Sequence, residues 1–288
     1  MGASHRAGPR VAPARPGDLD VGAPVSQRWR ERRATFRPRG EGFDASVYGV
    51  EPLDRDTEAR DFVERHHYSG SYPAARLRVG LYRRRAWVRP ELVGVAVFSV
   101  GVQPAAVTSW SGEAPAAGLD LGRFVLLDDV EFNAETWFLA RAFRLLAATL
   151  PDVRVVLSYS DPLARVTDAG ALVTPGHVGT IYQAKGASYR GQTRASWIHL
   201  DRHGRTISPR SLAKIRLGER GWESAARGLV ERGADHRQFG EEPQAWLARV
   251  LPNFRRVRHP GQHVYLFAPT GTAAGLPASL AYPKRGAA

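Results

Sequence analysis

The segment RFVLLDDVEFNAETWFLARAFRLLAATLPDVRVVLSYSD, from Arg123 to Asp161, decides the fold of this chain. Two short apolar runs, Phe124–Leu127 and Val153–Leu157, flank an amphipathic segment that opens at Asn133. Pro151 closes that segment, because proline cannot continue a helix. One amphipathic helix between two buried strands predicts a βαβ unit with parallel strands and a right-handed crossover.

Polar residues follow both predicted strands, at positions 128–133 and 158–161. Ligands of βαβ units bind beyond the carboxyl ends of the strands and at helix N-termini, so this edge is the expected active-site region. Asn133 can cap the helix, and the N–H groups of the first turn favour a phosphate, although an ordinary cap explains the same residue. No glycine-rich loop precedes Asn133, which excludes a P-loop and a dinucleotide-binding fingerprint.

The rest of the chain divides into one folded domain, residues 45–269, between two tails. Residues 1–44 form a basic segment rich in Arg, Pro, Gly and Ala without periodic apolar residues, so we expect them to be disordered, like residues 270–288. Within the domain we expect a helix at Thr57–His66 with Asp56 as its N-cap, strands at Leu77–Tyr82 and Leu92–Val100, a loop at 101–120, the βαβ unit, a strand at Val178–Ala184, a hairpin of Ala195–Leu200 and Arg205–Ile207, helices within 208–251, and a final strand at Val264–Ala268. This order predicts an α+β (mixed α/β) domain with a helical C-terminal excursion.

The charge of the chain indicates a polyanionic partner such as nucleic acid, because the formal net charge is +13. Nearly all of the positive charge is arginine, which a GC-rich coding sequence also produces without any function. The chain has no cysteine, which excludes disulfides and a cysteine nucleophile. No apolar run approaches the roughly 20 residues that span a bilayer, and no secretory signal is recognisable. We therefore expect a cytoplasmic protein without a membrane partner.

Ser158 and Asp161 end the second strand of the βαβ unit and are candidate acceptors for the proton of an amine. An exocyclic amine on a heteroaromatic ring is a poor nucleophile, because its lone pair is delocalised, and an acceptor aimed at its N–H would help it attack. Asp161 precedes Pro162, so an ordinary turn residue is the alternative. Tyr159 offers a stacking face, and Tyr182 offers a hydroxyl or a ring at the end of its predicted strand, where the alternative is a core aromatic residue.

Two histidines and a tyrosine, His66, His67 and Tyr68, follow the first predicted helix. With His177 and Asp161 they could form a His/carboxylate site for iron or zinc, although such clusters are often only polar loops. The absence of a G-x-S-x-G motif argues against a serine hydrolase, and the absence of cysteine excludes the usual zinc deaminase.

Several motifs together resemble the Mom family of phage DNA-modification proteins. They are HYS at His67–Ser69, LGRF at Leu121–Phe124, NAET at Asn133–Thr136, SYSD at Ser158–Asp161, GHVGTIYQA at Gly176–Ala184 and RHPGQHVYLF at Arg258–Phe267. The resemblance implies an acyltransferase-like fold of the GNAT type. In that fold the pyrophosphate of acetyl-CoA, or of a related acyl donor, lies at the helix opening, here Asn133, Ala134, Glu135 and Thr136. The glycine-rich pyrophosphate loop of GNAT enzymes is absent here.

The implied activity is modification of adenine N6 in double-stranded DNA to a methylcarbamoyl-type group, which protects phage DNA from restriction. The resemblance places His67, Tyr68, Arg123, Ser158 and Tyr182 in the active centre and links the family to iron, whereas Asp161 is added from its chemistry.

The target adenine must be flipped out of the duplex and held by aromatic faces, which Tyr68, Tyr159 and Tyr182 can supply. Arg123 can hold a phosphate or the carbonyl of a small-molecule donor. Arg83–Arg85 or Arg255–Arg258 can follow the DNA backbone. Two alternatives are an acetyl-CoA-dependent N-acetyltransferase of a protein or small amine, and a non-catalytic DNA-binding protein of the same fold.

Overall fold

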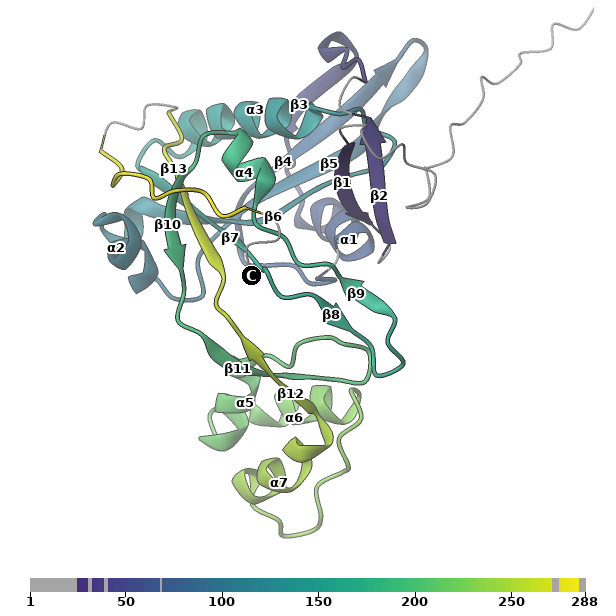
Figure 1. Cartoon of the computed structure of the whole chain (residues 1–288), viewed down its shortest axis with the longest axis vertical. Helices are drawn as coiled ribbons and strands as arrows, with labels where there is room; N and C mark the ends of the chain where they lie inside the picture. Colours follow the sequence, from purple (N-terminus) through teal and green to yellow (C-terminus); the bar gives the residue numbers. More distant parts are fainter. Residues whose placement is uncertain (1–24, 31–32, 39–40, 68, 271–274, 285–288) are drawn as a thin grey trace, which may run out of the picture.

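A computed structural model describes residues 25–30, 33–38, 41–67, 69–270 and 275–284. Its centre is a seven-stranded sheet with the strand order β10-β13-β7-β6-β5-β4-β3 (Figure 1). The strands are β3 (Tyr48–Pro52), β4 (Ala75–Arg85), β5 (Val88–Ser99), β6 (Gly118–Leu126), β7 (Val155–Ser160), β10 (Ser188–Gln192) and β13 (His263–Phe267). A mixed sheet flanked by helices confirms the predicted fold class.

The predicted βαβ unit is present as β6, the helix α3 (Ala134–Thr149) and β7. The strands β6 and β7 are parallel, whereas every other neighbouring pair in the sheet is antiparallel. Their ladder pairs Gly118 to Asp120 with Val155 to Leu157 and ends there, while β6 continues to Leu126. The apolar stripe of α3, which includes Phe138, is buried against the sheet. The two strands therefore pair only at their beginnings.

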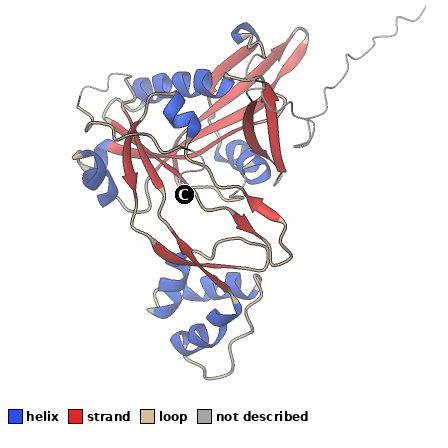
Figure 2. Ribbon diagram, in the orientation of Figure 1, coloured by secondary structure: helices blue, strands red, loops and turns tan. Residues whose placement is uncertain are grey.

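Helices cover both faces of the sheet (Figure 2). On one face, α1 (Asp56–His66) packs on β5 and β6, and α2 (Ala105–Ser111) packs on β7. On the other face, α3 packs on the sheet, and Tyr182 of α4 (Thr180–Ala184) contacts Tyr265 and Phe267 of β13. Short 3-10 turns lie at Ala45–Val47, Pro115–Ala117 and Leu251–Asn253.

Residues 193–262 extend beyond the sheet as an arm, at the bottom of Figure 1. A two-stranded ribbon of β11 (Ser196–Leu200) and β12 (Arg255–His259) carries three helices, α5 (Pro209–Arg216), α6 (Trp222–Val230) and α7 (Pro243–Val250). The helices share their own apolar core around Trp246 and Ile215. The predicted helical excursion is thus confirmed, and Ser208 caps α5 by accepting a hydrogen bond from the Ser211 N–H.

Four local predictions were wrong. The expected loop at 101–120 contains the helix α2 and the start of β6. Residues 180–184 form the helix α4 instead of a strand, because Gly179 adopts a left-handed conformation that turns the chain (φ 71°). The strand β11 pairs with β12, and only a single bridge, Leu200 to Thr206, joins it to the predicted hairpin partner. Asp56 lies inside α1, where Arg55 occupies the N-cap position.

The tails also differ from the expectation of disorder where the structure describes them. Residues 25–30 and 33–38 form the antiparallel pair β1 and β2, while residues 1–24 lie outside the described part. Residues 275–284 lie along β10, where the Leu280 N–H donates to the Tyr189 carbonyl (2.9 Å) and the Tyr282 hydroxyl donates to the Ala187 carbonyl (2.6 Å). This segment covers an edge strand, whose backbone groups would otherwise lack partners. The remaining strands, β8 (Arg165–Val166) and β9 (Leu172–Thr174), form a small hairpin. No helix among the described residues combines the length and apolarity needed to cross a bilayer.

Candidate functional site

Four of the predicted site residues fall into two groups, and the first consists of His67 and Arg123 together with His177. His67 directly follows α1, and Arg123 lies on β6 opposite Val97, on the sheet face that α1 covers. Burial, and then the charge of Arg123 and the nearby His177, hold the pKa of His67 far below its ordinary value. The imidazole of His67 is therefore neutral near pH 7.

The hydrogen bonds of His67 define its tautomer. Its Nδ1 accepts the backbone N–H of Ser69 (3.2 Å) and lies 2.9 Å from the Ser69 hydroxyl. A neutral imidazole that accepts at Nδ1 carries its proton on Nε2. His67 is thus arranged as an Nε2–H donor and not as a base at that nitrogen.

Arg123 fixes the loop that follows α1. Its guanidinium donates to the Ser71 carbonyl (2.8 Å), to the Ser71 hydroxyl (2.7 Å) and to the Gly122 carbonyl (2.5 Å). These bonds hold Ser71, four residues after His67, against β6. Tyr68, which lies in this loop, falls outside the described residues.

The second group, Ser158, Tyr182 and Tyr265, lies on the sheet face under α4. Ser158 and Tyr265 are paired across β7 and β13, so their side chains point to the same face. The ring of Tyr182 packs on that of Tyr265, with the centroids 5.4 Å apart. Ser158 is fully buried, and its Oγ has no hydrogen-bond partner among the residues that the structure describes. A buried hydroxyl without a partner is uncommon, and a ligand group would satisfy it.

The GHVGTIYQA segment connects the two groups. The His177 N–H donates to the Asp161 carbonyl (2.8 Å), which ties the segment to the end of β7. The hydroxyl of Tyr265 donates to the Val178 carbonyl. A Cβ at Gly179 would lie 2.7 Å from the Tyr265 ring, so only glycine permits this approach. The segment therefore carries His177 to the first group and Tyr182 to the second.

Asp161 is the centre of a half-buried ion-pair network. One carboxylate oxygen accepts from His259 Nε2 (3.0 Å) and the Leu163 N–H (2.9 Å), and the other accepts from Arg165 (3.0 Å). Burial raises the pKa of Asp161, but the hydrogen bond from His259 and the charge of Arg165 outweigh it, so the pKa lies below its ordinary value. With these bonds Asp161 positions the arm, and the sequence did not reveal its partners, although His259 lies in the RHPGQHVYLF motif.

Tyr159 does not share the face of Tyr182. Its neighbours along β7 alternate, and its side chain packs with Leu157 and Val107 under α2. Burial, and then the charge of Asp120, raise the pKa of the Tyr159 hydroxyl. Burial also raises the pKa of Asp120 itself to about 6, a carboxylate that the sequence did not single out. Tyr159 and Tyr182 cannot therefore both stack on one base from the same side of the sheet.

Carboxylates surround the N-terminus of α3, where we expected the coenzyme. Asn133 stands at the N-cap position in a left-handed conformation (φ 73°), but its side chain makes no capping hydrogen bond. Glu41 accepts the Phe132 N–H (2.9 Å), and Glu135 is buried in the first turn. Negative charges at these positions repel a pyrophosphate. The residues at Asn133–Thr136 therefore do not fit the phosphates of acetyl-CoA.

A metal site does not fit the described residues either. No group of three or more His, Asp or Glu side chains with ligand spacing occurs among them. Asp161 uses both carboxylate oxygens, and His67 uses Nδ1, in the hydrogen bonds described above. The described residues therefore do not fit a site for iron or zinc.

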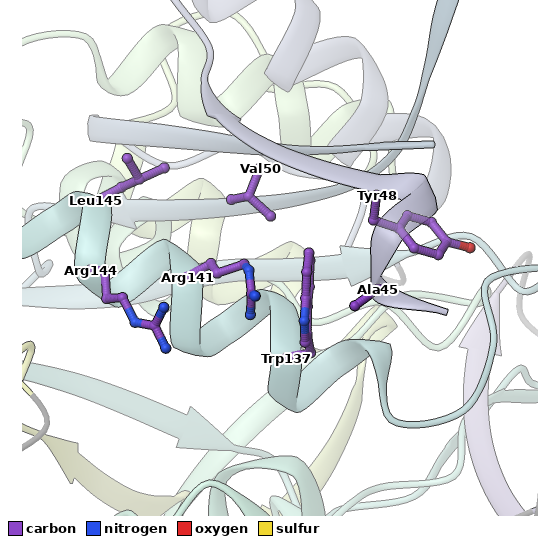
Figure 3. Close-up of a pocket in the computed structure, with 7 residues that line it drawn as sticks. All are labelled: Ala45, Tyr48, Val50, Trp137, Arg141, Arg144 and Leu145. Atoms are coloured by element: carbon purple, nitrogen blue, oxygen red, sulfur yellow. The ribbon is translucent and has the colours of Figure 1, made fainter. Parts of the chain in front are cut away.

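Two surface hollows of the described residues lie elsewhere. One, of about 390 Å³, lies between β3 and the outer side of α3 and is lined by Ala45, Tyr48, Val50, Trp137, Arg141, Arg144 and Leu145 (Figure 3). There the Arg141 guanidinium lies 3.5 Å from the centre of the Trp137 ring. The second, of about 510 Å³, lies between α3 and the C-terminal segment and includes Lys185 and Tyr282. Neither hollow is lined by a predicted site residue.

Comparisons with known proteins identify the family. A search of curated proteins found no match. One solved structure, a tandem GNAT protein from the clavulanic acid biosynthesis pathway (without AcCoA), is 12% identical, with a TM-score of 0.37, over 77% of this chain and 98% of that one. The model of the Mom protein family matches residues 48–268, which span the sheet, both groups of site residues and the arm. The chain therefore belongs to the Mom protein family, a membership that supports a role of the DNA-modification type.

Proposed function

We propose that this protein is a transferase that modifies adenine N6 in double-stranded DNA with a methylcarbamoyl-type group and so protects phage DNA from restriction. The observation that carries the proposal is the family match over residues 48–268. The two groups of site residues lie on opposite faces of the sheet. The assignments below therefore follow from the chemistry of each group and from the family match.

The adenine amine is assigned to the group under α4. The N6 lone pair is delocalised into the purine, so a hydrogen-bond acceptor for its N–H assists attack. The buried Oγ of Ser158 lacks a partner in the described structure and can accept this bond. The ring of Tyr182 offers a face for the flipped base, whose extraction from the duplex costs a few kcal/mol.

The carbonyl of the donor is assigned to the group of His67, Arg123 and His177. When N6 attacks, negative charge develops on the carbonyl oxygen of the donor. A neutral imidazole that donates from Nε2, beside the charge of Arg123, stabilises such an oxygen. The leaving group departs with the bonding electrons and takes up the proton that N6 loses, while the Ser158 hydroxyl accepts a hydrogen bond from the N6 amine. The donor is a small molecule, and acidic residues at the start of α3 argue that its recognition does not depend on a pyrophosphate there.

The test expresses the full-length chain in bacteria and digests the cellular DNA to nucleosides for mass spectrometry. We expect a new deoxyadenosine derivative with the wild-type chain and none with Ser158→Ala. Acetylated amines alongside unmodified DNA would instead identify an N-acetyltransferase. DNA binding without any adduct would identify a non-catalytic DNA-binding protein, and either result would contradict the proposal.

A further inference from the structure

The ribbon of β11 and β12 has one basic, aromatic face that the two groups of site residues do not use. In the antiparallel register Trp197 is opposite Arg258, and His199 is opposite Arg256. Paired residues point to the same side of a ribbon, so these four side chains form one surface, which we call the ribbon face. Trp197 is 50% exposed, and both arginines are exposed as well.

The arginines of the ribbon face stack on its tryptophan. The Arg256 guanidinium lies 4.3 Å, and that of Arg258 5.6 Å, from the centre of the Trp197 ring. In the part of the chain that the structure describes, neither guanidinium has an acidic side chain within ion-pairing distance. The charges of Arg256 and Arg216 also lower the pKa of His199, after the effect of burial, so a further arginine adds to the positive field here. The stacking on Trp197 thus holds the two guanidinium groups in place, while their positive charges are not neutralised by a described carboxylate.

The opposite side of the ribbon has the reverse character. Ile198 and Leu200 are buried there, and Arg255 pairs with Asp168 (3.9 Å). The carboxylate of Asp168 thus lies on the side of the ribbon opposite to the ribbon face. Charge alone therefore gives the ribbon a side that repels cations and attracts anions.

Rigid contacts join the ribbon to the candidate active centre. His259, the last residue of β12, donates to Asp161 at the end of β7 (3.0 Å) and accepts the Gly261 N–H at Nδ1 (3.0 Å). The Thr193 N–H donates to the Gln262 carbonyl (2.9 Å), and the Gln262 N–H donates to the Thr193 hydroxyl (2.9 Å). A Cβ on Gly261 would collide with the Thr193 carbonyl, so the two linkers lie in close contact. An object bound on the ribbon face is therefore held in a fixed direction from Ser158 and His67.

We propose that the ribbon face binds the sugar–phosphate backbone of double-stranded DNA and presents the duplex to the active centre. This inference rests on the proposed function, which makes duplex DNA the substrate. Arginine guanidinium groups bind phosphate oxygens through paired N–H donors, and an indole packs on deoxyribose or on an unstacked base. A two-stranded ribbon also has the width that a major groove admits. The contacts are to phosphates, so binding is independent of base sequence.

The experiment measures binding of a short fluorescent DNA duplex to the full-length chain by anisotropy over a series of salt concentrations. We compare wild type with Arg256→Gln/Arg258→Gln and with Trp197→Ala. The matched control is Arg84→Gln/Arg85→Gln, which removes the same charge from exposed arginines that lie close to Glu51 and Glu91. Thermal unfolding of each variant verifies that it is folded.

We expect the ribbon double variant to bind the duplex at least roughly tenfold more weakly and to lose about 2 from the magnitude of the salt slope, whereas the control stays near wild type. Equal losses in both double variants would overturn the proposal, because net charge alone would then explain them. Wild-type affinity of the ribbon variants would also overturn it. The same ribbon variants are also tested for binding to anionic lipid vesicles. If they lose vesicle binding but keep duplex binding, the ribbon face binds a lipid surface and the proposal is overturned as well. A wild-type chain that binds DNA through the ribbon but leaves its adenines unmodified would instead end the proposed function.

Discussion

Two basic regions lie at opposite ends of the molecule, and they differ in their acidic neighbours. The hairpin tip, formed by Arg83, Arg84, Arg85 and Trp87, joins β4 to β5, and the ribbon face lies on the arm (Figure 1). Arg83 pairs with Glu91 (2.9 Å) and Asp129 (2.7 Å), and Arg84 pairs with Glu51 (2.8 Å). In ion pairs of this kind the carboxylates neutralise the charge of the arginine, so that it stabilises the fold and does not attract an anionic partner.

The arginines of the ribbon face can attract an anionic partner, because the nearby carboxylate, Asp168, lies on the opposite side of the ribbon. Both regions also carry an exposed tryptophan, yet Trp87 is fully exposed at a turn while the guanidinium groups of Arg256 and Arg258 lie over the Trp197 ring. Arginine content and exposed aromatic residues therefore do not by themselves indicate a nucleic-acid surface. The distribution of carboxylates decides which of two arginine clusters can bind phosphate.

The largest effect on stability is expected from Asp161→Ala, which removes the carboxylate that joins the arm to the sheet. The change leaves Arg165 and His259 without the half-buried carboxylate that they share, at a cost of about 3 kcal/mol in the free energy of unfolding. Chemical denaturation measures this cost. Asp168→Ala, which removes an exposed carboxylate at the back of the ribbon, should cost less than about 0.5 kcal/mol. Similar costs for the two variants would show that Asp161 does not hold the arm.

Arg83→Gln tests the structural role of the hairpin tip. The Arg83 side chain is only 11% exposed and joins two carboxylates, so we expect a loss of about 1 kcal/mol in stability. DNA affinity should remain that of wild type. A fall in affinity equal to that of the ribbon variant, without a loss of stability, would reverse the roles of the two regions.

Trp87→Gly provides the aromatic counterpart. Trp87 adopts a left-handed conformation (φ 63°), which glycine adopts without strain, and its side chain buries no surface. The free energy of unfolding should change by less than about 1 kcal/mol, in the stabilising direction, because relief of strain exceeds the entropy that glycine adds to the unfolded chain. Duplex affinity should not change. If Trp87→Gly weakened DNA binding as Trp197→Ala does, the tip would have to be part of the DNA surface.

The last prediction concerns the dependence of stability on pH, which distinguishes the centre from the hairpin tip. The pKa of His67 is lower in the folded chain than its ordinary value of 6.5, so protonation favours the unfolded state. The contribution of neutral His67 to stability is complete above pH 6.5 and is lost as the pH falls below it. His67→Gln should therefore show a shallower decrease in stability between neutral and acidic pH. A decrease as steep as that of wild type would mean that His67 is not held neutral.

Much of the central fold was predictable because its signals are local. The apolar runs and the helix of residues 123–161 lie next to each other in the chain, and parallel pairing follows from the crossover. The partner of β11 lies more than fifty residues later in the chain, so no local pattern identifies β12. The short helix α4 depends on the packing of Tyr182 on Tyr265, which overrides the strand propensity of Val178, Thr180 and Ile181.

The candidate site was predictable in its residue types but not in its arrangement. Ser158 and Tyr182 share one neighbour, because Tyr265 pairs with Ser158 across β7 and β13 and packs on the Tyr182 ring. His259 lies 98 residues from Asp161, so the network that uses its carboxylate leaves no trace in local sequence. The acids around the start of α3 come partly from Glu41, in a segment that we expected to be disordered. Long-range contacts of this kind decide which polar side chains form hydrogen bonds within the protein and which can bind a ligand.

The most direct test is nucleoside mass spectrometry of DNA labelled with ¹⁵N at adenine N6 and exposed to the wild-type chain in cells. The proposed function predicts a deoxyadenosine derivative whose added carbonyl group remains bonded to the labelled nitrogen on fragmentation. It also predicts that Ser158→Ala abolishes this product and that Arg256→Gln/Arg258→Gln reduces it. Only unmodified deoxyadenosine, from cells in which the folded wild-type chain accumulates, would contradict the account.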